Sequence, residues 1–204
     1  MARCGKGATV HSKELMLTGA SRYSAYSNRA FARAVKMLAF ICFTSIGAQL
    51  AVRLPFTPVP VTMQTLFVVL AGVTLGPRDG FYAMLSYIAL GFAGVPVFAG
   101  FGFGPAALLG PTGGYLVSFP AAALVSGYIS ARLGSSRRAI GAASLCGMAL
   151  ILVSGASYLA LISGLPFSRA ALLGIAPFAA GELVKALMVS FISHRRTDLQ
   201  SVLG

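Results

Sequence analysis

The sequence predicts an all-α integral membrane protein, a bundle of six transmembrane helices with both termini in the cytoplasm. Hydrophobic residues make up 57% of the 204 residues and charged residues only 10%, whereas soluble domains carry about 25% charged residues. The apolar residues fall into six segments, and about 20 such residues suffice to cross the hydrocarbon core of a bilayer. The placement of lysine and arginine between these segments sets the orientation.

The N-terminal residues 1–29 differ from the rest of the chain. They contain basic residues among Ser, Gly and Thr, and they lack an apolar run long enough to insert into a membrane. We interpret them as a basic, mobile cytoplasmic extension that precedes a transmembrane domain at 30–204. A cleaved signal peptide is the alternative, because residues 45–48 weakly resemble a cleavage site. The first apolar stretch is longer and starts later than in signal peptides, which favours a retained helix.

Proline, glycine and charged residues divide the remaining chain into helices. The predicted helices cover 31–52, 61–76, 81–97, 113–131, 139–162 and 170–193. The second is short for a full crossing, and tilting or local thinning of the bilayer would accommodate it. Two connections are unusual, since 53–60 is rich in proline and 100–114 is rich in glycine. Non-helical backbone at membrane depth is tolerated only where protein buries it or where it lines a cavity.

The basic residues predict the side of the membrane on which each connection lies. With the N-terminus inside, thirteen fall inside, namely Arg3, Lys6, Lys13, Arg22, Arg29, Arg33, Lys36, Arg78, Arg132, Arg137, Arg138, Arg195 and Arg196. Only Arg53 and Arg169 fall outside. This asymmetry favours a multi-pass protein of the cytoplasmic (inner) membrane with both termini inside. Both unusual connections then lie on the outer side, where an importer first meets its ligand.

Signatures of catalysis and of metal binding are missing from the sequence. His11 and His194 lie in predicted cytoplasmic segments, and Cys4, Cys42 and Cys146 are scattered without metal-ligand spacing. The sequence also lacks a phosphate-binding G-x-x-x-x-G-K-[ST] loop, so any ATP-driven work needs another subunit. The net charge of +12 follows from membrane topology and indicates no nucleic-acid partner. We therefore expect no catalytic residues, no metal and no cofactor.

The strongest signal at the level of single residues is Glu182 and Lys185, inside the last apolar segment. Residues three apart share one face of a helix, and isolated charges are costly within a membrane. One interpretation is an internal ion pair that stabilises the bundle. The other is a ligand-binding pair, which we favour because buried pairs add little stability. Pro177 suits the first turn of this helix, which places the pair in its outer half.

Further candidate residues flank the two unusual connections. The polar residues Thr62 and Gln64 follow the first connection, and the polar residues Thr112 and Tyr115 flank the glycines that begin with Gly113 at the end of the second. Aromatic walls could come from Phe56, Phe98, Phe101 and Phe103. A small amphipathic ligand needs such an apolar enclosure with a few directed polar groups. Each residue also has a structural interpretation, since threonine caps helices, tyrosine anchors at interfaces and glycine permits tight turns.

Three stretches of the sequence resemble the BioY family. They are 54–66 (LPFTPVPVTMQTL), 109–116 (LGPTGGYL) and 181–185 (GELVK), the last resembling a Gly-Asp-x-x-Lys pattern. They occur in the family's order, and the resemblance runs from about residue 30 to the end. Glu182 stands where the family usually has Asp, and its extra methylene moves the carboxylate by about 1.5 Å. The glycine-rich connection also departs, with Phe101, Phe103 and Pro105 among its glycines.

The resemblance implies a six-helix substrate-binding component of an energy-coupling-factor (ECF) transporter that captures biotin with high affinity. It implies that Glu182 accepts from a ureido N–H of biotin, while Lys185 either donates to the ligand or neutralises Glu182. It also implies as partners a membrane coupling subunit and two cytoplasmic ATPases. Ala30 and Ala34, four apart on the first helix, would let the coupling subunit approach closely.

Other functions stay open from the sequence. The same architecture could capture another vitamin or small heterocycle, which the unusual Glu182 keeps open. A stand-alone secondary importer of biotin would need no ATPase. An intramembrane enzyme is least favoured, because it needs a nucleophile and a base together within the membrane.

Overall fold

The computed structural model describes residues 30–134 and 136–203, the last ten of these by their backbone alone. The chain divides into two compact units, 1–36 and 37–204, which are considered separately. The predicted extension 1–29 lies outside the described residues.

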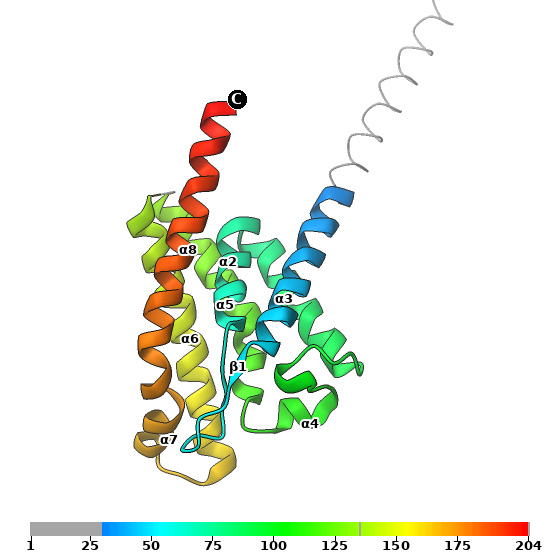
Figure 1. Ribbon diagram of the computed structural model, residues 1–204, viewed down its shortest axis with the longest axis vertical. Coiled ribbons are helices and arrows are strands. Elements are labelled where there is room, and N and C mark those ends of the chain that lie inside the picture. The colour runs from blue at the N-terminus through cyan, green and yellow to red at the C-terminus, as the bar shows by residue number, and fades with distance from the viewer. Residues whose placement is uncertain (1–29, 135, 204) are drawn as a thin grey trace, which may run out of the picture. The chain divides into compact units, whose positions relative to one another are not determined.

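Helices make up most of the second unit (Figure 1). Its longer helices are α2 (Gln64–Leu75), α3 (Pro77–Phe92), α5 (Gly113–Leu133), α6 (Arg137–Ser163) and α8 (Ala176–Leu203). The shorter ones are the 3₁₀ helix η1 (Ala99–Phe101), α4 (Gly104–Leu109) and α7 (Phe167–Gly174). The strands β1 (Ala51–Val52) and β2 (Val61–Thr62) form a small antiparallel ribbon. One further helix, Ala30–Gln49, begins in the first unit and ends in the second.

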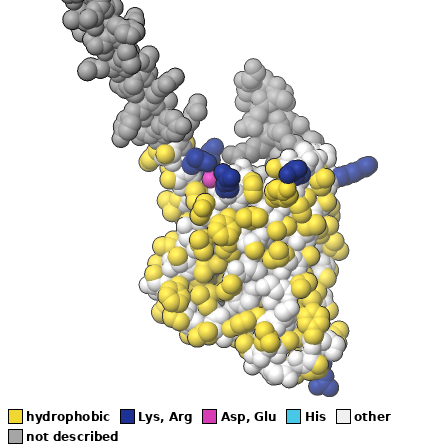
Figure 2. Space-filling model, turned by 180° about the vertical axis from the view of Figure 1, so that it is seen from behind, with side chains coloured by type: hydrophobic (Ala, Val, Ile, Leu, Met, Phe, Trp, Pro, Cys, Tyr) yellow, Lys and Arg dark blue, Asp and Glu magenta, His cyan; other side chains and the backbone are white. Residues whose placement is uncertain are grey.

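Four of the described helices are long and apolar enough to cross a membrane, namely Ala30–Gln49, Gly113–Leu133, Arg137–Ser163 and Ala176–Ser193. With 12 and 16 residues, α2 and α3 rise only about 18 and 24 Å, compared with a hydrocarbon core of about 30 Å. The mostly helical fold is therefore as predicted, with four candidate spans, while six crossings stay a prediction. The sides of the bundle carry large exposed apolar residues such as Val117, Leu161 and Leu183. On the face drawn in Figure 2, hydrophobic side chains cover much of the described surface, as a lipid-facing surface requires.

Several predicted elements differ from the structure. Residues 51–52 and 61–62, expected to be helical, form the strands β1 and β2, and the helix predicted at 81–97 is α3, which ends at Phe92. The segment 170–193 was expected to be one helix, but a break at Ile175 separates α7 from α8. Pro177 explains the break, because its ring lacks an N–H and clashes with the carbonyl four residues earlier in a continuous helix. The connection 100–114 was expected to be a glycine-rich loop, but it includes the helix α4. Pro105 lies in the first turn of α4, where a missing N–H costs nothing.

The helix α5 is the centre of the second unit and packs against α2, α3 and α6. Small residues allow these close contacts, since a Cβ at Gly72 of α2 would overlap the carbonyl of Ala123 on α5. Such close approach of small residues replaces the hydrophobic driving force that helices in lipid lack.

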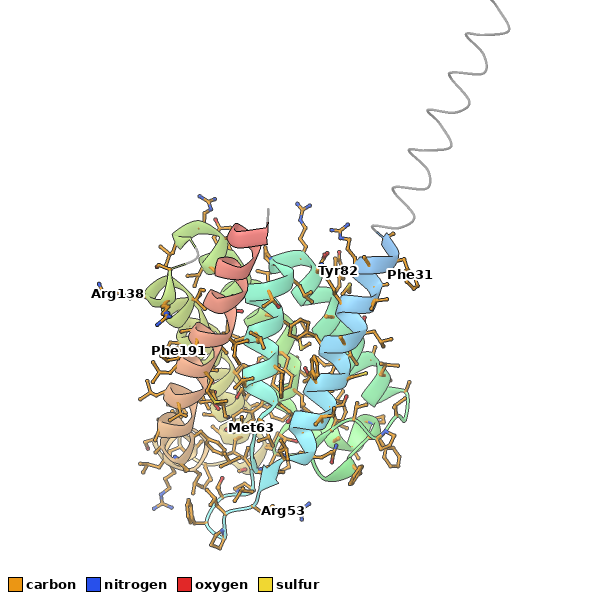
Figure 3. The ribbon with its side chains drawn as sticks, turned by 45° about the horizontal axis from the view of Figure 1, so that its top comes forward. Phe31, Arg53, Met63, Tyr82, Arg138 and Phe191 are labelled. Atoms are coloured by element: carbon orange, nitrogen blue, oxygen red, sulfur yellow. The ribbon has the colours of Figure 1, made fainter. Side chains whose placement is uncertain are left out.

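Basic side chains lie mainly at one end of the second unit. Arg78 lies at the start of α3, next to the turn from α2. Where α5 ends and α6 begins lie Arg132, Arg137 and Arg138. The two groups share one end of the unit, because Gly127 near the end of α5 lies against Pro77 at the start of α3. Arg53 and Arg169 belong to the other end, and Figure 3 shows Arg53 and Arg138 far apart along the bundle. The ribbon, η1, α4 and α7 share the end of Arg53.

Candidate functional site

A cavity of about 430 Å³ lies within the second unit, at the end that carries Arg53. This volume falls in the usual range of small-molecule sites, about 300–1,000 Å³. Apolar walls are provided by Phe98, Tyr115, Leu116, Phe119, Ile151, Leu152 and Phe178. Polar groups are provided by Arg53, Thr57, Thr62, Gln64, Thr65, Thr112 and Glu182. The cavity thus combines an apolar enclosure with a few polar groups, as binding of a small amphipathic molecule requires.

The proline-rich loop 53–60 forms one side of this cavity. It connects β1 and β2, whose register pairs Ala51 with Thr62 and Val52 with Val61. The Thr57 hydroxyl donates to the Leu173 carbonyl at 2.8 Å. That carbonyl is free to accept because the residue four positions later is Pro177, which has no N–H. The break between α7 and α8 therefore supplies the anchor for the loop.

The same break positions Tyr115 of α5. The Phe178 N–H donates to the Ile175 carbonyl at 3.0 Å, so it leaves the Gly174 carbonyl available. The Tyr115 hydroxyl donates to that carbonyl at 2.9 Å. Non-helical backbone inside a membrane protein is stable only with such partners. Tyr115 therefore presents its ring to the cavity, while its hydroxyl is used within the protein.

Glu182 and Lys185 on α8 form a buried ion pair next to the cavity. The Lys185 Nζ donates to Glu182 Oε1 at 2.7 Å, to Thr65 Oγ1 at 2.9 Å and to the Thr62 carbonyl at 2.7 Å. Both charged residues are only 5% exposed. An ammonium group has three donors, and all three are used here. In this arrangement Lys185 neutralises Glu182 and has no donor left for a ligand.

The second carboxylate oxygen of Glu182 has no such partner. Oε1 accepts from Lys185 and from the Thr65 hydroxyl, the latter at 3.0 Å. Oε2 is buried and accepts no hydrogen bond from any described residue. An unpaired buried polar group costs about 1–3 kcal/mol, and more when it is charged. Because Glu182 lines the cavity, an N–H group of a ligand is the natural donor to Oε2.

Gln64, at the start of α2, is held by neighbouring residues. Its Oε1 accepts from the Thr62 hydroxyl at 3.1 Å, and its Nε2 donates to the Tyr87 hydroxyl at 2.7 Å. Tyr87 is fully buried and donates in turn to the Val97 carbonyl at 2.8 Å. The Gln64 amide is therefore fixed in one orientation at the cavity wall.

The structure brings six predicted site residues to the cavity, namely Thr62, Gln64, Phe98, Thr112, Tyr115 and Glu182. Lys185 lies behind Glu182 and is not part of the lining. Gly113 lies outside the lining against α4, where a Cβ would overlap the Leu108 carbonyl. Phe56 and Phe101 are 59% and 67% exposed and do not line the cavity. Phe103 is exposed as well, whereas Phe98 is 2% exposed and forms part of the wall.

Sequence reasoning missed several residues of this site. They are Arg53, Thr57, Thr65, Phe119 and Phe178 in the lining, and Tyr87 behind Gln64. Thr57 carried a signal, because it stands within the proline-rich stretch. Thr65 stands within the stretch 54–66 that resembles the BioY family, but its partners on α8 are 117 and 120 residues away in the chain, so its contacts could not be read from the sequence. Of the proposed docking pair, Ala30 and Ala34 in the first unit are both exposed.

Comparisons with known proteins agree on one family. The model of the BioY family matches residues 20–201. A probable biotin transporter BioY of Pyrococcus horikoshii is 42% identical over 165 residues, which cover 80% of this chain and 96% of that protein. The biotin transporter BioY of Thermotoga maritima is 32% identical over 166 residues, covering 81% and 96%.

A solved structure shares the fold. The crystal structure of the S-component for biotin from an ECF-type ABC transporter superposes with a TM-score of 0.79 at 25% sequence identity. The match covers 84% of this chain and 93% of that one.

Proposed function

The chain belongs to the BioY family, and we propose that it captures biotin with high affinity as the substrate-binding subunit of an ATP-driven ECF importer. The observation that carries this proposal is the buried Glu182 Oε2, an acceptor without a donor at the wall of a cavity. The names of the relatives and of the structural neighbour support biotin as the ligand.

Biotin has groups that complement this cavity. Its ureido ring offers two N–H donors and one carbonyl acceptor, and its thiophane ring is apolar. A ureido N–H would donate to Glu182 Oε2, and the fixed Gln64 amide lies on the same cavity wall. The thiophane ring would pack between aromatic walls such as Phe119 and Phe178. The site then resembles other small-molecule sites, in which a few polar groups orient a ligand within an apolar enclosure.

Binding of labelled biotin to the purified protein and its variants tests this assignment. Glu182→Ala removes the acceptor, and Lys185→Ala leaves Glu182 without its neutralising charge. Losing a partner of a buried charged group costs more than about 1–3 kcal/mol. We therefore expect each variant to bind biotin at least tenfold more weakly than the wild type.

Leu183→Ala is a matched control, because Leu183 lies on the same turn of α8 and is 55% exposed. We expect this variant to bind biotin as the wild type does. Unchanged binding in both Glu182→Ala and Lys185→Ala would contradict the assignment.

Orientation and partners are part of the same proposal. Arg78, Arg132, Arg137 and Arg138 gather at the end of the second unit away from the cavity, and basic residues favour the cytoplasmic side. The cavity then opens to the outside of the cytoplasmic membrane and both termini lie inside. The membrane coupling subunit and the two ATPases would act from the cytoplasmic side, with Ala30 and Ala34 as the docking residues.

A further inference from the structure

Arg53 is a cavity residue with no ion-pair partner among the described residues. It lines the cavity and is exposed. The acids whose side chains are described are Asp79, which lies in the first turn of α3 towards the far end of the unit, and Glu182, which is paired with Lys185. The charge of Arg53 is therefore available to a ligand.

The small ribbon relates the position of Arg53 to that of Glu182. Arg53 follows Val52, the last paired residue of β1. Because Ala51 is the residue that pairs with Thr62, Arg53 lies two positions along the strand from the residue opposite Thr62. Two positions along an antiparallel ribbon correspond to about 7 Å. The Thr62 carbonyl accepts from Lys185, the partner of Glu182. The Arg53 backbone is thus displaced along the ribbon from the level at which the Thr62 carbonyl holds Lys185 beside Glu182.

The segment 98–102 lies beside the guanidinium. A Cβ built on Gly100 would be 3.0 Å from the Arg53 Nη2 atom. Gln49 fixes this segment, because its Nε2 donates to the Phe98 carbonyl at 3.1 Å and its Oε1 accepts from the Phe101 N–H at 3.0 Å. The segment also lines the cavity through Phe98, Ala99 and Gly102. This segment therefore borders the Arg53 side chain at the cavity.

From this arrangement we infer that Arg53 receives the carboxylate of the captured ligand, while the N–H donors of that ligand lie at Glu182. The substrate class follows: a small monoanion with N–H donors at one end, an apolar middle and a carboxylate at the other end. An arginine fork matches a carboxylate with two parallel hydrogen bonds. This inference rests on the proposed function. It adds the orientation of the ligand in the cavity, and it names Arg53 as the group that selects a free acid.

The test compares biotin with biotin methyl ester, which has the same ring system without the negative charge. Binding of both ligands is measured for the wild type and for Arg53→Gln. We expect the wild type to prefer the acid by about tenfold, and Arg53→Gln to bind the acid as weakly as the ester. Ester binding should be the same in both proteins, which also shows that the variant is folded. Added salt should weaken acid binding by the wild type more than by Arg53→Gln.

Arg169→Gln is the matched control. Arg169 lies on α7 at the same end of the unit, carries the same charge and does not line the cavity. It should keep the full preference for the acid. Equal binding of acid and ester by the wild type, or an undiminished preference in Arg53→Gln, would overturn the role of Arg53. Failure of the wild type to bind either ligand would overturn the proposed function, and the role of Arg53 with it.

Discussion

At the scale of single residues, the geometry of Glu182 explains how the site uses a longer acid than the aspartate of the family pattern. Oε1 of this longer side chain accepts from both Lys185 and Thr65. Oε2 is left without a partner at the cavity. The spacing of Glu182 and Lys185 allowed the pair to be predicted from the sequence. The sequence left open whether Lys185 donates to the ligand or neutralises Glu182. It could not distinguish these roles, because two partners of Lys185 come from the Thr62–Thr65 region, far away in the chain.

Variants should distinguish the contribution of this ion pair to the stability of the protein from its contribution to ligand binding. Lys185→Met leaves a buried carboxylate unpaired, which costs about 3–5 kcal/mol, so thermal unfolding in detergent should occur at a clearly lower temperature. In the double variant Glu182→Gln/Lys185→Met no charge is buried, and the unfolding temperature should return close to that of the wild type. Biotin binding should stay weak in both. Strong binding by the double variant would show that the ligand does not need the Glu182 carboxylate.

At the scale of elements, the break between α7 and α8 organises one side of the site. Pro177 correctly predicted the first turn of the last helix. The residues before it are apolar as well, so α7 was not predicted as a separate helix. The consequence of the break is long-range, since the freed carbonyls of Leu173 and Gly174 accept from Thr57 and Tyr115. Hydropathy and spacing describe neighbours along the chain, so they predict the helix start and cannot predict which distant side chain uses a freed carbonyl.

Thr57→Val should loosen the proline-rich loop without changing the size of the side chain. The lost hydroxyl bond to Leu173 is worth about 0.5–1.5 kcal/mol. Hydrogen exchange of the backbone amides of residues 53–59 should become faster, and biotin should dissociate several-fold faster. Thr74→Val is the control, because the Thr74 hydroxyl donates to the Leu70 carbonyl of its own helix at 2.6 Å. Equal dissociation rates in both variants would show that the Thr57 contact does not hold the loop.

At the scale of the whole molecule, composition alone predicted a helical protein that spans a membrane. Four described helices meet the length and apolarity of a span. The shorter helices α2 and α3 are not among these four and form a hairpin. The ribbon of β1 and β2 precedes α2, and the loop 53–60 between its strands forms one side of the cavity. The sequence predicted at which end of the bundle the cavity would lie. It could not predict the full set of lining residues, because these come from loops and helices far apart in the chain.

The proposed coupling to partner subunits is also tested at the scale of the whole molecule. Replacing Ala30 and Ala34 together with tryptophan should abolish biotin uptake by cells that contain the coupling subunits, because large side chains prevent close approach of another helix. Binding by the purified protein should be unchanged. Ala32→Trp is the control, since Ala32 is exposed as well and lies about 200° around the same helix. Full uptake by the double variant would contradict the docking role, and uptake without any coupling subunits would indicate a stand-alone importer.

The central claim is that the cavity beside Glu182 captures biotin. The most direct test is equilibrium binding of labelled biotin to the purified wild-type protein, alone and with an excess of other vitamins. We expect saturable binding of one biotin per chain, displaced by unlabelled biotin and not by the other vitamins. Absence of saturable binding, or displacement by an unrelated vitamin at least as effective as by biotin, would contradict it.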